Sequence, residues 1–478
     1  MSSPTLSPSA LESLLGPWRE RAAGPAYRSL ADRIRLLALD GRIAIESRLP
    51  AERELAARIG LSRTTVTAAY RVLREQGYAE SLRGSGTRVL LPGTQEGGGL
   101  LPDEGLLDLS RATLPATHRI ADAAQHAAAE LPAHLGDPGY QLRGLPGLRA
   151  AVAEYYRGRG IATVPEQILI TNGAQHAISL LARTLLRRGD TALIEQPSYP
   201  NAITALRATG AKLLPVNVTT EDGWDEEELL RLLRADRPSL GYLMPDFQNP
   251  TGRTMSDPFR ERLTAAARAS GTVLIADETT AELNIDRVIA PHSLAAHGSA
   301  VLIGSVSKAA WGGLRVGWIR AGQALIRQLA EARPASDLGT PILEQLTVTR
   351  LLDEWPEVLA ARRDQLAAGR SALTRGVTER FPAWRVPEIE GGLAAWIGLG
   401  APRSSALTLA ARQEGLLLAA GPRFGLAGAL ERYLRLPLGL PEAELGSALD
   451  ALARAWATLD GSGSPARGRD AAARYPVL

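Results

Sequence analysis

The chain has 478 residues, too many for a single hydrophobic core, so we expect two to four domains. Its hydrophobic content of 45% is normal for a soluble globular protein, and no apolar run approaches the roughly 18 residues that a membrane helix needs. Cysteine is absent, which excludes disulfides and cysteine-ligated metal sites. The first residues lack the basic start and apolar core of a signal peptide, so we expect a cytoplasmic protein.

The net charge of +3 hides an uneven distribution along the chain. Residues 17–90 contain 14 Arg against 8 Asp and Glu, a local charge of +6 (14 − 8), so the remainder carries −3 (3 − 6). A basic block on an acidic remainder suggests a polyanionic partner, although a solvated charged face would give the same count.

Lysine is rare in this sequence. Of the 54 basic side chains, only Lys212 and Lys308 are lysine. Lysine differs from arginine because its amine can lose a proton and act as a nucleophile. Lys212 precedes an apolar run and is expected at a strand edge. Lys308 ends the motif GSVSK at 304–308, which follows the predicted strand at 300–303.

Two helices joined by a tight turn are expected near the start of the chain. The first spans 49–60 and ends at Gly60, and the second spans 63–75 after Ser62, a good N-cap. Arg and Thr at the start of the second helix suit the major groove of DNA, where Arg reaches guanine edges and Thr reaches phosphates or thymine methyls. Residues 78–89 predict strand, glycine turn and strand, a wing beside these helices. An ordinary helical pair with polar ends would share the bare pattern.

The composition changes after this wing. Residues 92–106 are rich in glycine and predict a flexible linker. β-like runs then alternate with helical patterns, which predicts an open α/β sheet with crossovers. After about Ile342 long helices mix with short strands, as in a smaller α+β domain, and the tail 459–478 has the composition of a disordered segment. The runs predicted as strands are 167–171, 191–195, 240–244, 272–276 and 300–303.

Several predicted strands end on residues that suit pyridoxal phosphate, at the sheet edge where open α/β sheets bind ligands. Lys308 offers the amine for a Schiff base, and Asp277 offers an acid beside the pyridine nitrogen. Gly173 turns a strand into a helix, Tyr199 suits stacking on the ring, and Asn249 lies on a turn. The residues expected at the phosphate are Ala174, Gln175, Ser305, Ser307 and Arg315. Each alone has an ordinary role as a turn or cap, but together they predict a cofactor site.

Residues 27–89 resemble the GntR-type winged helix domain through LPAERELA at 49–56, SRTTV at 62–66 and GSGT at 84–87. The resemblance implies a winged helix-turn-helix domain of α+β class at 15–91. It implies that the residues matching the family's DNA-contacting positions touch DNA here, and Arg83 is a further candidate because it lies in the predicted wing. The predicted DNA-binding residues are Arg53, Arg63, Thr64, Thr65, Arg83 and Gly84.

The region 107–458 resembles fold-type I pyridoxal-phosphate enzymes of the aminotransferase class I/II group. The resemblance implies an α/β large part at about 140–335 and a small α+β part at about 107–139 and 336–458. The stretch 139–149 matches an early family motif, whose tyrosine, here Tyr140, reaches the phosphate of the partner subunit in a homodimer with shared active sites. Arg435 falls where the family binds a substrate carboxylate.

A GntR domain, a linker and an aminotransferase-like domain, in that order, are similar to MocR-type transcriptional regulators. One departure is that the family usually has a tyrosine two or three residues after the acid matching Asp277, where this chain has Thr279 and Thr280. That tyrosine assists the phenolic oxygen of the cofactor, so its loss puts transamination in doubt and leaves more of that work to Asn249. The Asp-Glu-Thr-Thr version resembles the YczR-like subgroup, associated with control of a YczE-type membrane protein gene.

The resemblance implies a nucleoid-associated regulator that binds a double-stranded DNA operator. It would sense an amino compound through external aldimine formation at Lys308, with Arg435 holding a carboxylate, or sense pyridoxal phosphate through occupancy. A working aminotransferase with a fused DNA-binding domain is the alternative, and a purely structural dimerisation scaffold is a third.

Overall fold

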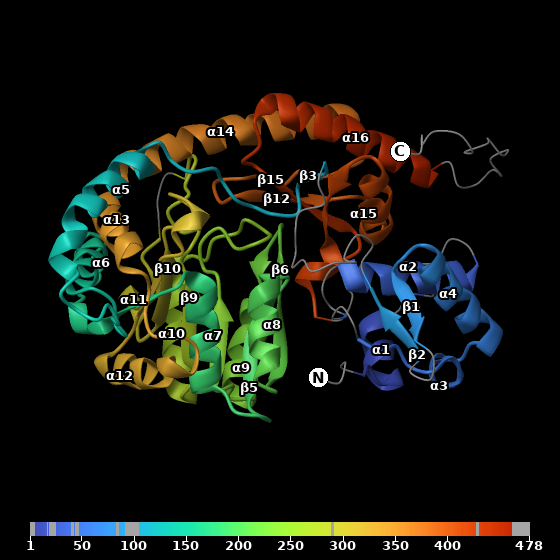
Figure 1. The fold of residues 1–478 in the computed structure, drawn as a ribbon, viewed down its shortest axis with the longest axis horizontal. Coiled ribbons are helices and arrows are strands. Elements are labelled where there is room, and N and C mark those ends of the chain that lie inside the picture. Colours follow the sequence, from blue (N-terminus) through green and yellow to red (C-terminus); the bar gives the residue numbers. More distant parts are fainter. Residues whose placement is uncertain are drawn as a thin grey trace.

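The computed structural model describes residues 5–16, 18, 25–39, 43, 47–82, 86–90, 105–287, 291–426 and 430–460. It shows a small helical body beside a larger α/β body of two parts (Figure 1). The predicted wing-tip residues Arg83 and Gly84 lie outside the described residues, as do nearly all of the predicted linker and the tail from 461. None of the described helices is both long and apolar enough to span a membrane.

The N-terminal body is a winged helix. Helix α4 packs on both α2 and α3, and the antiparallel strands β1 and β2 form the wing, with Ala79 opposite Val89. The buried core includes Leu30, Leu55 and Val66, and it extends to Leu11, ahead of the predicted boundary at residue 15. The elements are α1 (Pro8–Leu15), α2 (Ala26–Leu39), α3 (Glu52–Ile59), α4 (Arg63–Glu75), β1 (Ala79–Leu82) and β2 (Gly86–Val89).

The two predicted helices of this body are confirmed, with one shift at the start of α3. The helix begins at Glu52 rather than 49 because Leu49 pairs with the wing, donating from its amide to Thr87 O at 2.8 Å. Gly60 ends the helix in a left-handed conformation that suits glycine, at φ 63°. Ser62 caps α4 by accepting a hydrogen bond from the Thr65 amide at 3.1 Å.

The large part is built on an eight-stranded sheet of order β4-β11-β10-β9-β8-β5-β6-β7. Strands β11 and β7 run antiparallel to their neighbours and the other pairs are parallel, so the predicted open sheet with crossovers is confirmed. All five predicted runs are strands, and Lys212 is the exposed first residue of β6, as expected. The strands are β4 (Ile168–Thr171), β5 (Thr191–Gln196), β6 (Lys212–Thr219), β7 (Gly223–Trp224), β8 (Leu240–Leu243), β9 (Val273–Asp277), β10 (Val301–Ser305) and β11 (Gly317–Arg320).

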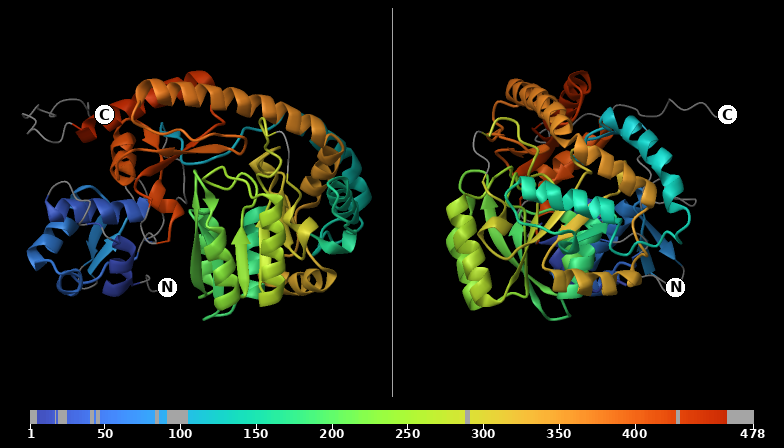
Figure 2. Two further views of the ribbon diagram at one scale, coloured as in Figure 1. Left: turned by 180° about the vertical axis from the view of Figure 1, so that it is seen from behind. Right: turned by 90° about the vertical axis from the view of Figure 1, so that its left-hand side faces the viewer.

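Helices cover both faces of this sheet (Figures 1 and 2). Side chains that alternate along β4 divide between two hydrophobic clusters, Ile168 and Ile170 in one and Leu169 in the other. The first cluster includes residues of α6, α9 and α10, and the second includes residues of α7, α8 and α12. The helices are α6 (Pro146–Gly158), α7 (Ala174–Leu185), α8 (Pro200–Ala208), α9 (Glu226–Ala235), α10 (Asp257–Ser270), α11 (Leu294–His297) and α12 (Gln323–Ala332).

The small part mixes long helices with short strands, as predicted. Helix α14, 26 residues long, runs from the large part to the small part, where a three-stranded sheet has the order β12-β15-β14 (Figure 2). Strand β3, the first after the linker, pairs in parallel with β13. The elements are β3 (Leu107–Asp108), α5 (Arg119–Glu130), α13 (Ile342–Asp353), α14 (Trp355–Arg380), β12 (Ala394–Gly398), α15 (Ser404–Gln413), β13 (Leu416–Leu417), β14 (Ala419–Ala420), β15 (Tyr433–Pro437) and α16 (Glu442–Asp460).

The winged helix lies against the small part of the same chain, with α2 in contact with α15. Arg33 of α2 forms an ion pair with Glu431 at 3.4 Å, and both side chains are about nine-tenths buried. Glu431 also accepts hydrogen bonds from the amide and hydroxyl of Ser405, at 2.9 and 2.6 Å. The carboxylate of Glu431 therefore ties the DNA-binding body to the small part.

Candidate functional site

Lys308 lies just beyond the end of β10, beside the end of β9. Its Nζ donates a hydrogen bond to Ala112 O at 2.8 Å. Burial, followed by the positive charge of Arg435, lowers the pKa of Lys308 to about 8, against the opposing effect of Asp277. A lysine with such a pKa provides neutral amine, the nucleophilic form, near physiological pH.

Asp277 ends β9 and is 2% exposed. Its Oδ2 accepts a hydrogen bond from the Tyr242 hydroxyl at 2.5 Å, and its Oδ1 accepts from the amide and hydroxyl of Thr279, at 3.0 and 2.7 Å. These three hydrogen bonds fix the orientation of the Asp277 side chain at the end of β9. An acid held in this way suits a place beside a pyridine nitrogen.

Tyr242 is a residue of this site that the sequence reasoning missed. It lies on β8, next to β9, and it is fully buried. Burial, followed by the negative charge of Asp277, raises the pKa of Tyr242 well above its usual value, so the phenol stays protonated and donates. The one available signal was a tyrosine within a buried apolar strand, where its hydroxyl must find a partner.

The two threonines that follow Asp277, Thr279 and Thr280, both use their hydroxyls in hydrogen bonds within the chain. Thr279 faces back toward Asp277, and the Thr280 hydroxyl donates to Asp246 O at 3.1 Å. Neither side chain offers the phenol that the resemblance expects at this place. Asn249 stays close to the site, since its Oδ1 accepts from Arg435 Nη1 at 3.3 Å.

A cradle for an anion forms where β4 turns into α7. Gly173 has φ 77°, a left-handed backbone that favours glycine, and a Cβ on it would lie 2.8 Å from Arg315 Nη2 and displace that guanidinium. Arg315 itself has a left-handed backbone, φ 53°, and donates from Nη2 to Asn172 O at 3.0 Å. The amides of Ala174 and Gln175 open α7 and have no partner within the helix, as an anion site at a helix N-terminus requires.

The two serines before Lys308 adjoin this cradle through β11, which pairs with both β4 and β10. The Ser305 hydroxyl donates to Val316 O at 2.9 Å and lies 3.1 Å from the Ser307 hydroxyl. A Cβ on Gly317 would lie 2.9 Å from the Ala174 amide, which shows how closely β11 approaches the start of α7.

Several buried polar atoms around the site have no hydrogen-bond partner among the described residues. They are Asn172 Oδ1, Gln175 Oε1, Ser198 Oγ and Arg435 Nε. Buried polar atoms without partners are rare in folded proteins, and a place for a ligand is one explanation. The donors, the glycine-lined cradle, the lysine and the acid together fit pyridoxal phosphate.

Arg435 and Tyr199 complete the site. Arg435 is 6% exposed and lies over the Phe424 ring, 4.9 Å from its centroid. Burial, followed by the positive charge of Arg423, lowers the pKa of Arg435 to about 10, so it remains charged at neutral pH. Tyr199 precedes α8 with its hydroxyl bonded by Asn201 at 2.9 Å, and its pKa is raised first by burial and then by the charge of Asp277.

Tyr140 differs from the other predicted cofactor residues. It lies in the loop before α6 and is 69% exposed in this chain. None of the described residues forms a hydrogen bond with its hydroxyl. The single chain therefore does not bring Tyr140 to Lys308, and a role for it depends on a second subunit.

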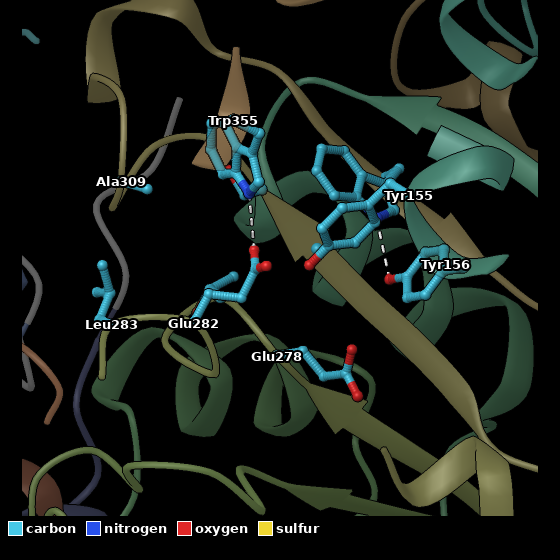
Figure 3. Close-up of a pocket in the computed structure, with 11 residues that line it drawn as sticks. Tyr155, Tyr156, Glu278, Glu282, Leu283, Ala309 and Trp355 are labelled. Carbon is cyan, nitrogen blue, oxygen red and sulfur yellow. Dashed lines mark hydrogen bonds between the residues drawn. The ribbon is translucent and has the colours of Figure 1, made fainter. Parts of the chain in front are cut away.

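Glu278, the residue after Asp277, lines a small pocket together with other acidic and aromatic side chains (Figure 3). Glu278 forms an ion pair with Arg159 at 3.1 Å and accepts from the Ser293 hydroxyl at 2.5 Å. Glu282 accepts from Trp355 Nε1 at 2.9 Å. The free space of about 20 Å³ holds no more than a water molecule. Glu278 is thus a structural neighbour of Asp277 rather than a second cofactor acid.

The DNA-facing residues predicted on α3 and α4 lie on the surface. Arg53, Arg63 and Thr64 are exposed, and Thr65 is half-buried. No described residue pairs with the guanidinium of Arg53 or Arg63. The Thr67 hydroxyl of α4 donates to Glu52 of α3 at 2.6 Å and fixes one helix on the other. Two such arginines beside a capped helix start leave this face available to a polyanion.

Two family models match this chain. "Aminotransferase class I and II" matches residues 108–452, and "Bacterial regulatory proteins, gntR family" matches residues 26–89. The chain belongs to the class I and II aminotransferase family and carries a gntR-family domain at its N-terminus. This combination is the domain order of the MocR-type regulators that the sequence resembles.

Known regulators are similar to this MocR-type chain. The HTH-type pyridoxine biosynthesis transcriptional regulator PdxR of Corynebacterium glutamicum is 30% identical over 403 residues, 79% of this chain and 84% of that protein. The probable rhizopine catabolism regulatory protein MocR of Rhizobium meliloti is 32% identical over 334 residues, 62% of this chain and 65% of that protein.

A solved structure resembles the C-terminal part. LysN, the α-aminoadipate aminotransferase of Thermus thermophilus, complexed with N-(5'-phosphopyridoxyl)-L-leucine, is 31% identical with a TM-score of 0.68. The alignment covers 75% of this chain and 94% of LysN. The MocR-type chain thus has a fold that holds a phosphopyridoxyl group in a relative.

Proposed function

We propose that this protein is a pyridoxal-phosphate-dependent transcriptional regulator of the MocR type, which binds a double-stranded DNA operator in the cytoplasm and senses an amino compound or pyridoxal phosphate itself. The observation that carries this proposal is the pairing of two sites on one chain. One is the exposed start of α4, and the other is the centre formed by Lys308, Asp277 and Arg435. The related regulators support the same conclusion.

Each cofactor residue has a role that follows from its contacts. Pyridoxal phosphate, when bound, supplies an electrophilic carbon that reacts reversibly with primary amines. Lys308 would hold it through its amine, and Asp277, aligned by Tyr242 and Thr279, would face the pyridine nitrogen. The start of α7 and Arg315 would hold the phosphate.

The ligand is proposed to carry a carboxylate as well as an amine. Arg435 is buried and charged, and its Nε has no partner among the described residues. A carboxylate would satisfy that donor and compensate the buried charge. This combination of groups describes an amino acid or a close analogue.

A homodimer is part of the proposal. Fold-type I aminotransferases share their active sites between subunits, and exposed Tyr140 is the residue expected to cross to the partner's phosphate site. The Asp-Glu-Thr-Thr stretch supports a place in the YczR-like subgroup.

A working aminotransferase is the second candidate, because Lys308, Asp277 and Arg435 are the residue types that such an enzyme needs for its Schiff base, its pyridine nitrogen and its substrate carboxylate. The Thr279 hydroxyl donates to Asp277 and the Thr280 hydroxyl donates to Asp246 O, so neither replaces the tyrosine that assists the phenolic oxygen of the cofactor in the family. Its loss argues against efficient turnover. Oxo-acid production from common amino acids distinguishes the two. If the protein is a regulator, we expect little or no oxo acid in a time that lets a related aminotransferase convert all of its substrate.

Cofactor binding itself is tested by the visible absorbance of purified protein titrated with pyridoxal phosphate. Wild type should gain a saturable visible band, and Lys308→Ala should not. Lys212→Ala is the matched control, because it removes the other lysine, exposed at the start of β6, and should behave as wild type. Equal bands in all three proteins, or none in wild type, would contradict the assignment.

A further inference from the structure

Three side chains outside the cofactor site meet on one flank of the large part. Asp257 opens α10, His297 ends α11, and His292 lies in the loop before α11. His292 Nδ1 is 3.0 Å from Asp257 Oδ2, and His297 Nε2 is 2.9 Å from Asp257 Oδ1. The three ligand atoms lie within 4.8 Å of one another, and no other group of three such side chains is found in the described part of the chain. The sequence has only six histidines, so two on one carboxylate is a notable concentration.

The chemistry of these three groups selects among metal ions. Two imidazole nitrogens and a carboxylate oxygen are typical zinc ligands, with bonds of about 2.0–2.2 Å. Calcium and magnesium prefer sets made only of oxygen. Ligand atoms around a tetrahedral zinc ion lie roughly 3.3–3.6 Å apart, given those bond lengths. The two nitrogen–oxygen contacts, at 3.0 and 2.9 Å, therefore need to open by about half an ångström, and the longest separation in the set, at most 4.8 Å, needs to shorten to the same spacing.

The scaffold already holds the three groups in position. The His292 amide donates to Asp257 Oδ1 at 2.9 Å, which orients the carboxylate. The Thr264 hydroxyl of α10 donates to His297 O at 3.2 Å and fixes α11 on α10. The two imidazole rings are nearly perpendicular, at 85°, with centroids 6.1 Å apart. His292 has 71% of its side chain exposed, which provides a route for the ion and freedom to adjust.

We propose that Asp257, His292 and His297 form a binding site for one divalent ion of the zinc class, with water completing the coordination. The site would fasten the loop before α11 onto α10. Arg260, one turn along α10 and fully buried, connects this flank to the cofactor site. Its Nη1 donates to His292 O at 2.9 Å and to Asp246 Oδ2 at 3.0 Å, and Asp246 begins the turn that carries Asn249.

The test is calorimetric titration of the full-length protein, loaded with pyridoxal phosphate, with Zn²⁺, followed by metal analysis after desalting. Wild type should bind one Zn²⁺ per chain at this site, and His297→Gln and His292→Gln should each weaken binding at least tenfold. His292 is largely exposed, so its replacement leaves the fold intact even if His297→Gln does not. His126→Gln is the matched control, because His126 is an exposed histidine whose Nδ1 contacts only Asp122 O.

Two results would overturn the proposal. Equal Zn²⁺ affinity in wild type and His292→Gln would mean that the three residues form only a hydrogen-bonded clamp. Zinc that persists in both histidine variants but disappears in Lys308→Ala would place the ion on the cofactor. Neither result bears on whether the protein is a regulator, because that proposal rests on other residues.

Discussion

At the scale of single residues, the centre of the site is the environment of Asp277 and Lys308. The sequence predicted both residues because each follows an apolar run predicted as a strand, where burying an ionisable side chain costs free energy. It did not predict Tyr242, because an aromatic residue in an apolar strand is ordinary core until a neighbouring strand brings a carboxylate within reach of its hydroxyl. The orientation of Thr279 toward Asp277 also depends on backbone geometry that no local pattern shows.

Tyr242→Phe should weaken pyridoxal-phosphate binding by about tenfold. The change removes a hydrogen bond to a buried carboxylate, and bonds to charged groups contribute about 1.5–3 kcal/mol. Tyr70→Phe is the control, because Tyr70 is also buried and donates to a backbone carbonyl, Pro50 O, but in the winged helix. Absorbance titration measures both, and an equal loss in the two variants would remove the special role of Tyr242.

The amine of Lys308 should react with pyridoxal phosphate increasingly as pH rises through about 8, rather than near 10.5. The sign follows from burial and Arg435, which both disfavour the protonated form. Arg435→Gln removes a positive neighbour and should move the midpoint to higher pH. Rates of appearance of the visible band, measured across pH, check this, and an unchanged midpoint in Arg435→Gln would contradict it.

At the scale of elements, the sequence predicted α3, α4, the wing and the five strands, because hydrophobic periodicity and caps such as Ser62 and Gly60 are local signals. The start of α3 was shifted because Leu49 pairs with the wing, a contact between residues distant in sequence. The same limit explains the antiparallel β11, which was not among the predicted strands.

Helix α4 should read the operator through its first turn. Arg63→Ala should weaken specific DNA binding by about 1–3 kcal/mol while the visible band of the bound cofactor stays unchanged. Arg71→Ala, on the same helix but paired with Glu75 at 3.6 Å, should cost less. Fluorescence anisotropy with labelled operator compares them, and wild-type affinity in Arg63→Ala would refute the assignment.

At the scale of the whole molecule, the two sites are joined through a short segment of the small part. Arg435 lies in the proposed ligand site, and Glu431, four residues earlier, binds Arg33 of the winged helix. Phe424, which holds the Arg435 guanidinium, accepts from the Ser198 amide beside the cofactor site at 2.9 Å. A ligand that moves Arg435 would therefore act on the contact that holds the DNA-binding body.

Glu431→Gln should uncouple the two sites, because it weakens the ion pair with Arg33. The ratio of operator affinities with and without an amino ligand should fall toward one, while cofactor binding stays normal. Glu414→Gln is the control, since Glu414 pairs with Arg454 within the small part at 2.7 Å. A ratio unchanged in Glu431→Gln would show that coupling takes another route.

The central claim is that the occupancy of Lys308 controls DNA binding, and operator affinity measured with and without pyridoxal phosphate and candidate amino acids tests it most directly. Affinity should change on addition of ligand in wild type and in Lys212→Ala, and should stay constant in Lys308→Ala. The same affinity in all three proteins under every condition, at a concentration where the cofactor is seen to bind, would contradict the account.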